Sequence, residues 1–366
     1  MIYLDQGATS YPKLPSVKQA VMDALDHNMN AQRSTGAFKT DRLLYLTRKL
    51  IAQYFNLPSF DHVVFNSGNT ESLNTCLKGI LSKDDHVITT YAEHNSVLRP
   101  LHQIGVNLTV TAPYKEDILK EIREDTKMIV MTHSSNVTGE LYDIESIGQL
   151  AYEHNILFVV DSAQSAGHIH VDMQKAHIDL LTFSGHKGLL GMSGVGGICI
   201  ITDTFIQPLK TGGTGIDSFN KSQPDSYPEH LEAGTLNIPG IASLNAGVTY
   251  LLEHQEEIEK KEKELFDALY QGMKHIPGII FYCDYDTCAH TPIIAFNLED
   301  YDSSKISDVL SYKYDIVTRC GAHCAPLMHT HLNTEERGIV RFSLSFMNTM
   351  EEIDTVINAL REMSEE

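Results

Sequence analysis

Short runs of β-branched and apolar residues alternate with longer segments of helical pattern between about residue 60 and residue 200. Because neighbouring parallel strands need long crossover connections, usually helices, this order predicts an α/β fold with a mainly parallel sheet. Most of the runs are apolar without polar alternation, which is typical of strands covered on both faces. The seven predicted strands are Asp61–Phe65, His86–Thr90, Asn107–Thr111, Met128–Thr132, Ile156–Asp161, Asp179–Phe183 and Gly196–Ile201.

A loop is predicted after this sheet, because residues 208–240 hold five Gly and four Pro. Residues 251–275 then place apolar side chains at helical spacing. Within this predicted helix, Glu precedes Lys by four residues three times over residues 256–263, a spacing that supports an exposed helix with a solvated face.

The C-terminal third has the pattern of a smaller α+β domain. Residues 292–298 and 338–345 are predicted strands, and residues 350–363 a closing helix. With about 150 residues per domain, a chain of 366 residues suggests two domains. We therefore expect a large domain over residues 15–245 and a small domain made of residues 1–14 and 246–366.

Charge and cysteine content narrow the possible partners and the compartment. The chain has 28 Lys and Arg against 48 Asp and Glu, a net charge of −20, which argues against a nucleic-acid partner. No apolar run is long enough to cross a bilayer and the first residues lack a signal pattern, so no membrane association and a cytoplasmic location are expected. Six cysteines are too few for a disulfide scaffold.

Lys187 follows a predicted buried strand in the segment Ser184-Gly185-His186-Lys187. Burial lowers the pKa of an amine, and a neutral amine can form an imine with an aldehyde cofactor. A lysine that caps a strand or helix end gives the same pattern. Asp161 ends another predicted strand, where a buried carboxylate needs a cation such as a protonated pyridine nitrogen; an ordinary turn-forming aspartate is the alternative.

A possible phosphate site lies at Asn66–Ser72, between a predicted strand and a predicted helix. Gly68 allows a close turn, and the free N–H groups that open a helix attract phosphate. A plain helix cap by Asn69 or Thr70 explains the same residues. By contrast, Cys283 and Cys288 have no second pair nearby in sequence, and we interpret them as structural rather than as a metal site.

These elements, in this order, resemble the pyridoxal 5′-phosphate enzymes of fold type I. The match is closest to class V aminotransferase-like proteins, in the cysteine desulfurase and selenocysteine lyase group. It covers nearly the whole chain, and its most specific segments are Ser184–Lys187, Glu232–Thr235 and Arg319–Leu327.

The resemblance implies a role for each matching residue around the cofactor. Lys187 would carry pyridoxal 5′-phosphate and move the substrate's α-proton, and Asp161 would keep the ring nitrogen protonated. Gln164 would bind the ring's phenolic oxygen, and His94 would stack on the ring and relay protons. The phosphate would be bound by Asn69, Thr70, Ser184 and His186. Thr235 would reach the cofactor of a second subunit, which implies a homodimer.

The resemblance also implies how the substrate is held and attacked. Asn136 and Arg341 match positions that bind the amino acid's carboxylate, for which the planar fork of Arg is suited. Cys324 would attack the substrate's sulfur or selenium, and His323 could lend positive charge to the thiol. Taken alone, Arg341 fits a surface charge at a strand end and Cys324 a small buried residue, which is the usual place of a free cysteine.

The predicted activity is removal of sulfur from L-cysteine, or selenium from L-selenocysteine, to give L-alanine, with a possible protein acceptor. Alternatives are a selenocysteine-specific lyase, a class V aminotransferase or epimerase that does not use Cys324, and a non-catalytic sulfur-transfer scaffold. Two segments depart from the family pattern, Asp5–Thr9 and Asn30–Ser34, and leave the substrate preference open.

Overall fold

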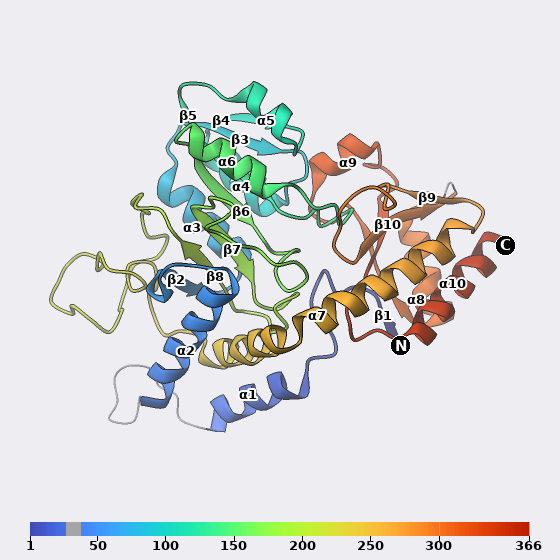
Figure 1. The fold of residues 1–366 in the computed structure, drawn as a ribbon, viewed down its shortest axis with the longest axis horizontal. Helices are drawn as coiled ribbons and strands as arrows, with labels where there is room; N and C mark the ends of the chain where they lie inside the picture. Colours follow the sequence, from blue (N-terminus) through green and yellow to red (C-terminus); the bar gives the residue numbers. More distant parts are fainter. Residues whose placement is uncertain (27–37, 300, 366) are drawn as a thin grey trace.

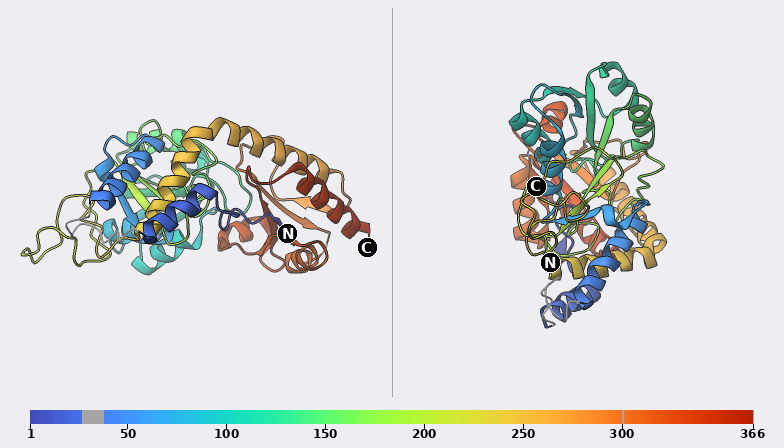
Figure 2. Two further views of the ribbon diagram at one scale, coloured as in Figure 1. Left: turned by 90° about the horizontal axis from the view of Figure 1, so that it is seen from below. Right: turned by 90° about the vertical axis from the view of Figure 1, so that its left-hand side faces the viewer.

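The computed structural model describes residues 1–26, 38–299 and 301–365, so the departure at Asn30–Ser34 lies outside the described residues. An α/β part built on a seven-stranded sheet and a smaller α+β part lie side by side, and both chain ends lie at the smaller part (Figure 1). The long helix α7 (Ile238–Lys274) runs along both parts (Figure 2).

The seven predicted strands are confirmed and form one sheet, with ends within two residues of those predicted. Neighbouring strands are parallel except around β8, which is antiparallel to both β2 and β7. No helix separates β7 from β8, and a short loop reverses the chain direction. The strand order is β2 (Val63–Asn66), β8 (Gly196–Ile200), β7 (Leu180–Ser184), β6 (Leu157–Asp161), β5 (Thr126–Thr132), β3 (His86–Thr90) and β4 (Asn107–Thr111).

The sheet is covered on both faces, as its apolar strands predict. Successive residues of β6 belong to different cores: Val159 packs with α3 (Asn69–Ile80) and α4 (Asn95–Ile104), whereas Phe158 and Val160 pack on the opposite face. That opposite core contains side chains of α2 (Phe38–Tyr54), α6 (Ile144–Glu153) and the first half of α7. Edge strand β4 is the exception and is partly exposed.

The smaller part holds a four-stranded antiparallel sheet, and its two predicted strands and closing helix are confirmed. The N-terminal strand pairs with this part, because Ile2 and Tyr3 lie beside Ile316 and Val317. Its elements are β1 (Ile2–Tyr3), β9 (Ile279–Phe281), β10 (Ile293–Leu298), α8 (Ser303–Tyr314), β11 (Ile316–Val317), β12 (Arg319–Gly321), α9 (Pro326–Leu332), β13 (Ile339–Ser343) and α10 (Met350–Glu365). The remaining elements are α1 (Pro15–Asp26), η1 (Phe60–His62) and α5 (Lys115–Glu121).

Helix α7 begins earlier than the predicted residue 251. The Asn237 side chain caps its first turn by accepting from the Gly240 N–H, and Pro239 is tolerated in that turn. The helix packs in the large core as far as Ile258 and in the small core from Leu265. The predicted domain boundary at residues 245 and 246 therefore falls inside a continuous helix, and the domain division stays a prediction.

The charged residues over 256–263 of α7 are exposed, as predicted, except Glu262, and the lysines pair with acids that follow them: Lys260 with Glu264 and Lys263 with Asp267. Glu262 is not solvated but buried, and its carboxylate lies 2.8 Å from His168. Burial alone would lower the pKa of His168, but the charge of Glu262 raises it.

None of the helices in the described residues is long and apolar enough to span a membrane.

Candidate active site

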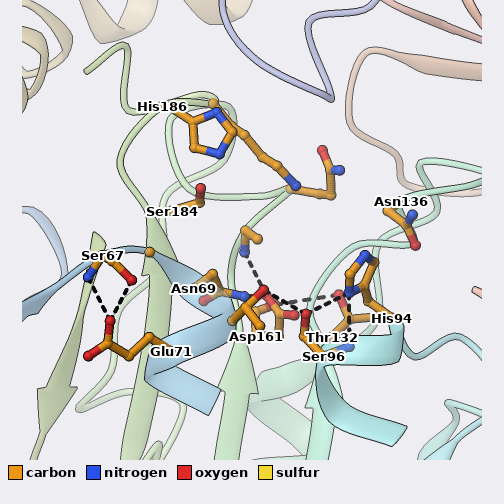
Figure 3. Close-up of a pocket in the computed structure, with 15 residues that line it drawn as sticks. Ser67, Asn69, Glu71, His94, Ser96, Thr132, Asn136, Asp161, Ser184 and His186 are labelled. Carbon is orange, nitrogen blue, oxygen red and sulfur yellow. Dashed lines mark hydrogen bonds between the residues drawn. The ribbon is translucent and has the colours of Figure 1, made fainter. Parts of the chain in front are cut away.

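A pocket opens at the carboxyl ends of β5, β6 and β7, beside the first turns of α3 and α4 (Figure 3). Ligands of open α/β sheets bind at such an edge. Nine of the twelve predicted site residues line this pocket: Asn69, Thr70, His94, Asn136, Asp161, Gln164, Ser184, His186 and Lys187. Arg341, Cys324 and Thr235 are the three that do not. Sequence reasoning missed several other lining residues, among them Ser96 and Thr132, because small polar side chains carry no distinctive pattern.

Lys187 and Asp161 both line this pocket, Asp161 at the end of β6 and Lys187 three residues after the end of the neighbouring strand β7. Burial lowers the pKa of Lys187 to about 8, although the charge of Asp161 acts in the opposite direction. The Asp161 carboxylate accepts hydrogen bonds from Asn69 Nδ2 at 2.8 Å and from the Ala163 N–H at 2.9 Å, both on Oδ1. A buried carboxylate held this way keeps its second oxygen for a cationic donor.

The peptide before Lys187 is held by the N-terminal segment, in which sequence reasoning singled out Asp5–Thr9 but neither Ser10 nor Lys13. The carbonyl oxygen of His186 accepts from Thr9 Oγ1 at 3.1 Å, from the Ser10 N–H at 2.9 Å and from Lys13 Nζ at 3.2 Å. Lys13 also donates to the Gly191 carbonyl on the far side of the same loop. Its ammonium group therefore joins both ends of the turn that presents Lys187.

Replacement of Lys13 by methionine is expected to reduce turnover by roughly tenfold, because a lost hydrogen bond to buried groups costs about 1–3 kcal/mol. It should also raise the pKa of His186, which burial lowers to about 4 with help from the charges of Lys187 and Lys13. Steady-state kinetics and NMR titration of His186 test this. Lys18→Met, on the exposed side of α1, is the control. An unchanged pKa for His186 would contradict a role for Lys13 at the site.

His94 is fixed as a neutral ring. Its Nδ1 accepts from the backbone N–H of Ser96 at 3.0 Å, which requires a lone pair there and leaves the proton on Nε2. The Ser96 hydroxyl lies 2.9 Å from Nδ1 and 2.8 Å from Thr70 Oγ1. Burial lowers the pKa of His94, in agreement with the neutral form. Its position as the cap of α4 thus sets its tautomer.

The residues at the start of α3 fit a phosphate group. Gly68 has φ 145°, a conformation that favours glycine. Gly196 of β8 packs closely against Gly68, since a Cβ on Gly196 would lie 2.6 Å from the Cα of Gly68. The first turn of α3 opens beside Ser184 and His186. Two buried polar atoms of the pocket, Asn69 Oδ1 and His186 Nδ1, have no hydrogen-bond partner. A phosphate oxygen would accept from His186 Nδ1 when the ring proton is on that nitrogen, whereas Asn69 Oδ1 is an acceptor and would need a donor group of the ligand.

Arg341 lies in the middle of β13 and is buried, so the interpretation as a surface charge at a strand end is wrong. Its Nη1 donates to the Asn136 carbonyl at 2.8 Å and its Nη2 to Asp5 Oδ1 at 2.8 Å. Gly7, in the segment that departs from the family pattern, leaves room for the guanidinium, since a Cβ there would lie 3.2 Å from Cζ.

Cys324 is exposed, so its interpretation as a small buried residue is also wrong. His323 and Cys324 both have left-handed backbone, with φ of 49° and 58°, which is costly for residues other than glycine. Two hydrogen bonds of 2.7 Å hold this loop, from Asn136 Nδ2 to the His323 carbonyl and from the Asn95 N–H to the Cys324 carbonyl. The Cys324 backbone therefore contacts the residue that follows His94, and Cys324 lies close enough to Lys187 to act on its pKa.

The predicted positive charge on His323 is wrong. Burial lowers the pKa of His323 well below its usual value, and the nearby Arg341 acts in the same direction. The ring is therefore neutral and cannot stabilise a thiolate by charge.

Thr235 is exposed and lies outside the pocket of its own chain. It lines a second hollow together with Lys210 and with Ser67 and Glu71, which also line the first pocket. Lys210 and Glu71, which both line this second hollow, form an ion pair.

Within the described residues no cluster of His, Cys, Asp and Glu suited to a metal ion is present, and Cys283 and Cys288 lie apart from the pocket.

Comparison with known proteins shows what the chain is similar to. It matches the family described as aminotransferase class-V over residues 2–356. A probable cysteine desulfurase of Pyrococcus abyssi is 31% identical, with 99% of this chain and 94% of the relative covered. The apo structure of the cysteine desulfurase from Thermococcus onnurineus NA1 superposes with a TM-score of 0.89 at 29% identity, covering 100% of this chain and 94% of the other. The cysteine desulfurase CsdA of Escherichia coli has a TM-score of 0.88 at 26% identity, with 99% and 94% covered.

Proposed function

The chain belongs to the aminotransferase class-V family, and from this premise we propose that it is an enzyme that removes sulfur from L-cysteine and leaves L-alanine. One observation carries the proposal. A lysine of lowered pKa and a buried aspartate share a pocket, and an exposed cysteine lies on a loop whose backbone is hydrogen-bonded to the residue that follows the pocket's histidine. An aminotransferase that uses only the pocket has no need of a thiol in this position.

The cofactor proposed for this pocket is pyridoxal 5′-phosphate. When bound, it supplies a protonated ring that accepts electrons from the substrate's α-carbon. Asp161 would hold the ring nitrogen, Gln164 the phenolic oxygen and His94 the ring, whereas Thr70, Ser184 and His186 would bind the phosphate. Asn69 supports this arrangement through its hydrogen bond to Asp161.

Lys187 moves the α-proton at its Nζ. A pKa of about 8 leaves an appreciable neutral fraction near neutral pH, whereas an exposed lysine with a pKa of about 10.4 would be almost fully charged. His94 carries its proton on Nε2 and can donate a hydrogen bond from that atom to a group in the pocket, because its Nδ1 already accepts from Ser96.

Asn136 and Arg341 hold the substrate's carboxylate. They are already linked, since the Asn136 carbonyl accepts from Arg341 Nη1. The Nε of Arg341 is buried without a partner, which provides a donor for an anion. Asp5 orients the guanidinium from the opposite side.

Cys324 takes the sulfur atom. Its thiolate attacks the sulfur of the substrate, the carbon–sulfur bond breaks, and the sulfur remains on Cys324 as a persulfide while the carbon skeleton leaves as alanine. The sum is cysteine plus a thiol giving alanine plus a persulfide, so no external oxidant is needed. An external thiol or a protein acceptor then removes the sulfur.

Incubation of the purified protein with L-cysteine and a dithiol tests this function. Alanine and sulfide are expected in equal amounts, because the dithiol releases the transferred sulfur. A requirement for a keto acid, or formation of racemised cysteine without sulfide, would contradict desulfuration and favour the aminotransferase or epimerase alternative.

A homodimer that shares its active sites is the proposed assembly, with Thr235 reaching the partner's phosphate. Lys187→Ala and Thr235→Glu chains should each be inactive alone. Mixing them under exchange conditions should restore about a quarter of the wild-type activity, since half of the random dimers hold one intact site of two. Sedimentation velocity checks that dimers are present. Failure of the mixture to regain activity while dimers form would contradict sharing of Thr235.

A further inference from the structure

A second pair of thiols lies outside the active site. Cys283 Sγ and Cys288 Sγ are 2.8 Å apart on the loop that joins β9 to β10, and both residues are half-buried. A disulfide needs about 2.05 Å between the sulfurs, so closure by less than 1 Å would join them. The hydrogen bond of 2.9 Å from the Cys288 N–H to the Asp284 carbonyl already holds the loop in the shape that brings the thiols together.

Small molecules can reach this pair. Cys288 lines a hollow between α7 and the segment that leads into β10, together with His168, Phe266 and His290. The hydrogen bond from the Cys283 thiol lowers the pKa of Cys288, which favours the nucleophilic thiolate at that position. Cys288 is therefore the thiol that should react first.

We propose that Cys283 and Cys288 form a reversible disulfide, a redox site separate from Cys324. The oxidant is a low-molecular-weight disulfide. The Cys288 thiolate attacks one of its sulfurs and releases one thiolate, which gives a mixed disulfide. The Cys283 thiolate then attacks the Cys288 sulfur and releases the second thiolate. Two protein thiols lose two protons and two electrons, and the small disulfide is reduced to two thiols.

The thiol pair is connected to the active site through hydrogen bonds. Tyr285, between the two cysteines, donates through its hydroxyl to the Thr138 carbonyl at 2.8 Å. The Leu141 N–H donates to the Ala289 carbonyl at 2.8 Å, just after Cys288. Thr138 and Leu141 follow Asn136 by two and five residues, and the Asn136 side chain holds the Cys324 loop. Oxidation should therefore stiffen the segment that supports Asn136.

Equilibration of the purified full-length protein with oxidised and reduced glutathione tests the proposal. After free thiols are alkylated, peptide mass mapping should show the 283–288 region two hydrogens lighter and not alkylated under oxidising conditions, and fully alkylated after dithiothreitol. Amide hydrogen exchange of residues 138–141 should be several-fold slower in the oxidised form. The readouts do not depend on desulfuration, so they remain valid whatever reaction the pocket performs.

Single substitutions show which of the two cysteines reacts first with glutathione and which one then closes the disulfide. Cys283→Ser should trap Cys288 as the mixed disulfide with glutathione, because the second thiol is missing, whereas Cys288→Ser should leave Cys283 largely unmodified. Cys320→Ser, which removes another half-buried thiol, is the matched control and should leave the disulfide unchanged. Complete alkylation of Cys283 and Cys288 at every ratio, or oxidation that links only Cys320 and Cys324, would overturn the proposal. Unchanged exchange of residues 138–141 would overturn the connection to the active site.

Discussion

Replacement of Lys187 by alanine is expected to lower turnover of L-cysteine by roughly 10⁴-fold and to abolish covalent retention of pyridoxal phosphate. The reason is that no other lysine lines the pocket among the described residues, so no second amine can take its place. Borohydride reduction followed by peptide mapping should place the cofactor on Lys187 in the wild type and nowhere in the variant. Lys261→Ala, on the exposed side of α7, is the control and should behave as the wild type. An adduct at another lysine would contradict the assignment.

The lowered pKa of Lys187 gives this prediction a pH dependence. Uptake of pyridoxal phosphate by cofactor-free protein needs the neutral amine, so its rate should rise with pH up to about 8 and then level off. The unfolded chain, with a lysine pKa of about 10.4, binds more protons than the folded protein between about pH 8 and pH 10.4. Lys187 therefore makes the free energy of unfolding increase with pH across this window. Lys13, whose pKa burial lowers to about 8, contributes with the same sign. Lys187→Ala should flatten this increase in part when unfolding by urea is measured at several pH values.

Substitution of Cys324 by serine is expected to lower sulfide release from L-cysteine by at least ~10³-fold, because a hydroxyl is a far weaker nucleophile toward sulfur than a thiolate. Retention of the cofactor should be unchanged, since Cys324 lies outside the pocket that holds it. Release of selenium from L-selenocysteine should fall much less, because a selenol has a lower pKa than a thiol and leaves with less assistance. Comparing both substrates in wild type and variant therefore decides between a cysteine desulfurase and a selenocysteine-specific lyase.

Cys320→Ser is the matched control for this experiment, since it changes a thiol on the same stretch of chain by the same chemistry. It should retain wild-type sulfide release. Wild-type activity of Cys324→Ser, with activity lost in Cys320→Ser, would move the nucleophile to Cys320. Mass spectrometry of the protein after a single turnover, with a mass increase of one sulfur atom expected on Cys324, distinguishes these outcomes directly.

The large sheet could be predicted from the sequence because its information is local. Most of the strands are short apolar runs bounded by polar residues, and burial on both faces is the environment that suits such runs; edge strand β4 is the exception. Lys187 and Asp161 could be proposed for a related reason. Charged groups at the ends of buried strands are costly without a partner, so their occurrence there indicates a ligand.

Local patterns failed where a contact joins distant parts of the chain. The charge pattern of α7 predicted a solvated Glu262, but the fold brings it against His168. Lys13 has no distinctive sequence context, and only the packing of the N-terminal segment under the loop of Lys187 gives it a role. The predicted charge on His323 failed because adjacency to Cys324 says nothing about burial.

The sequence by itself determined the α/β architecture, the family and the residue types available for chemistry. Only the tertiary structure decided which of those groups are charged and which of them meet. Arg341, Asp5 and Asn136 form one buried group although more than 200 residues separate Arg341 from Asn136. The physical reason is that periodicity and residue type act over a few neighbouring residues, whereas pKa values and hydrogen-bond partners depend on solvent exclusion and on contacts that exist only once the chain has folded.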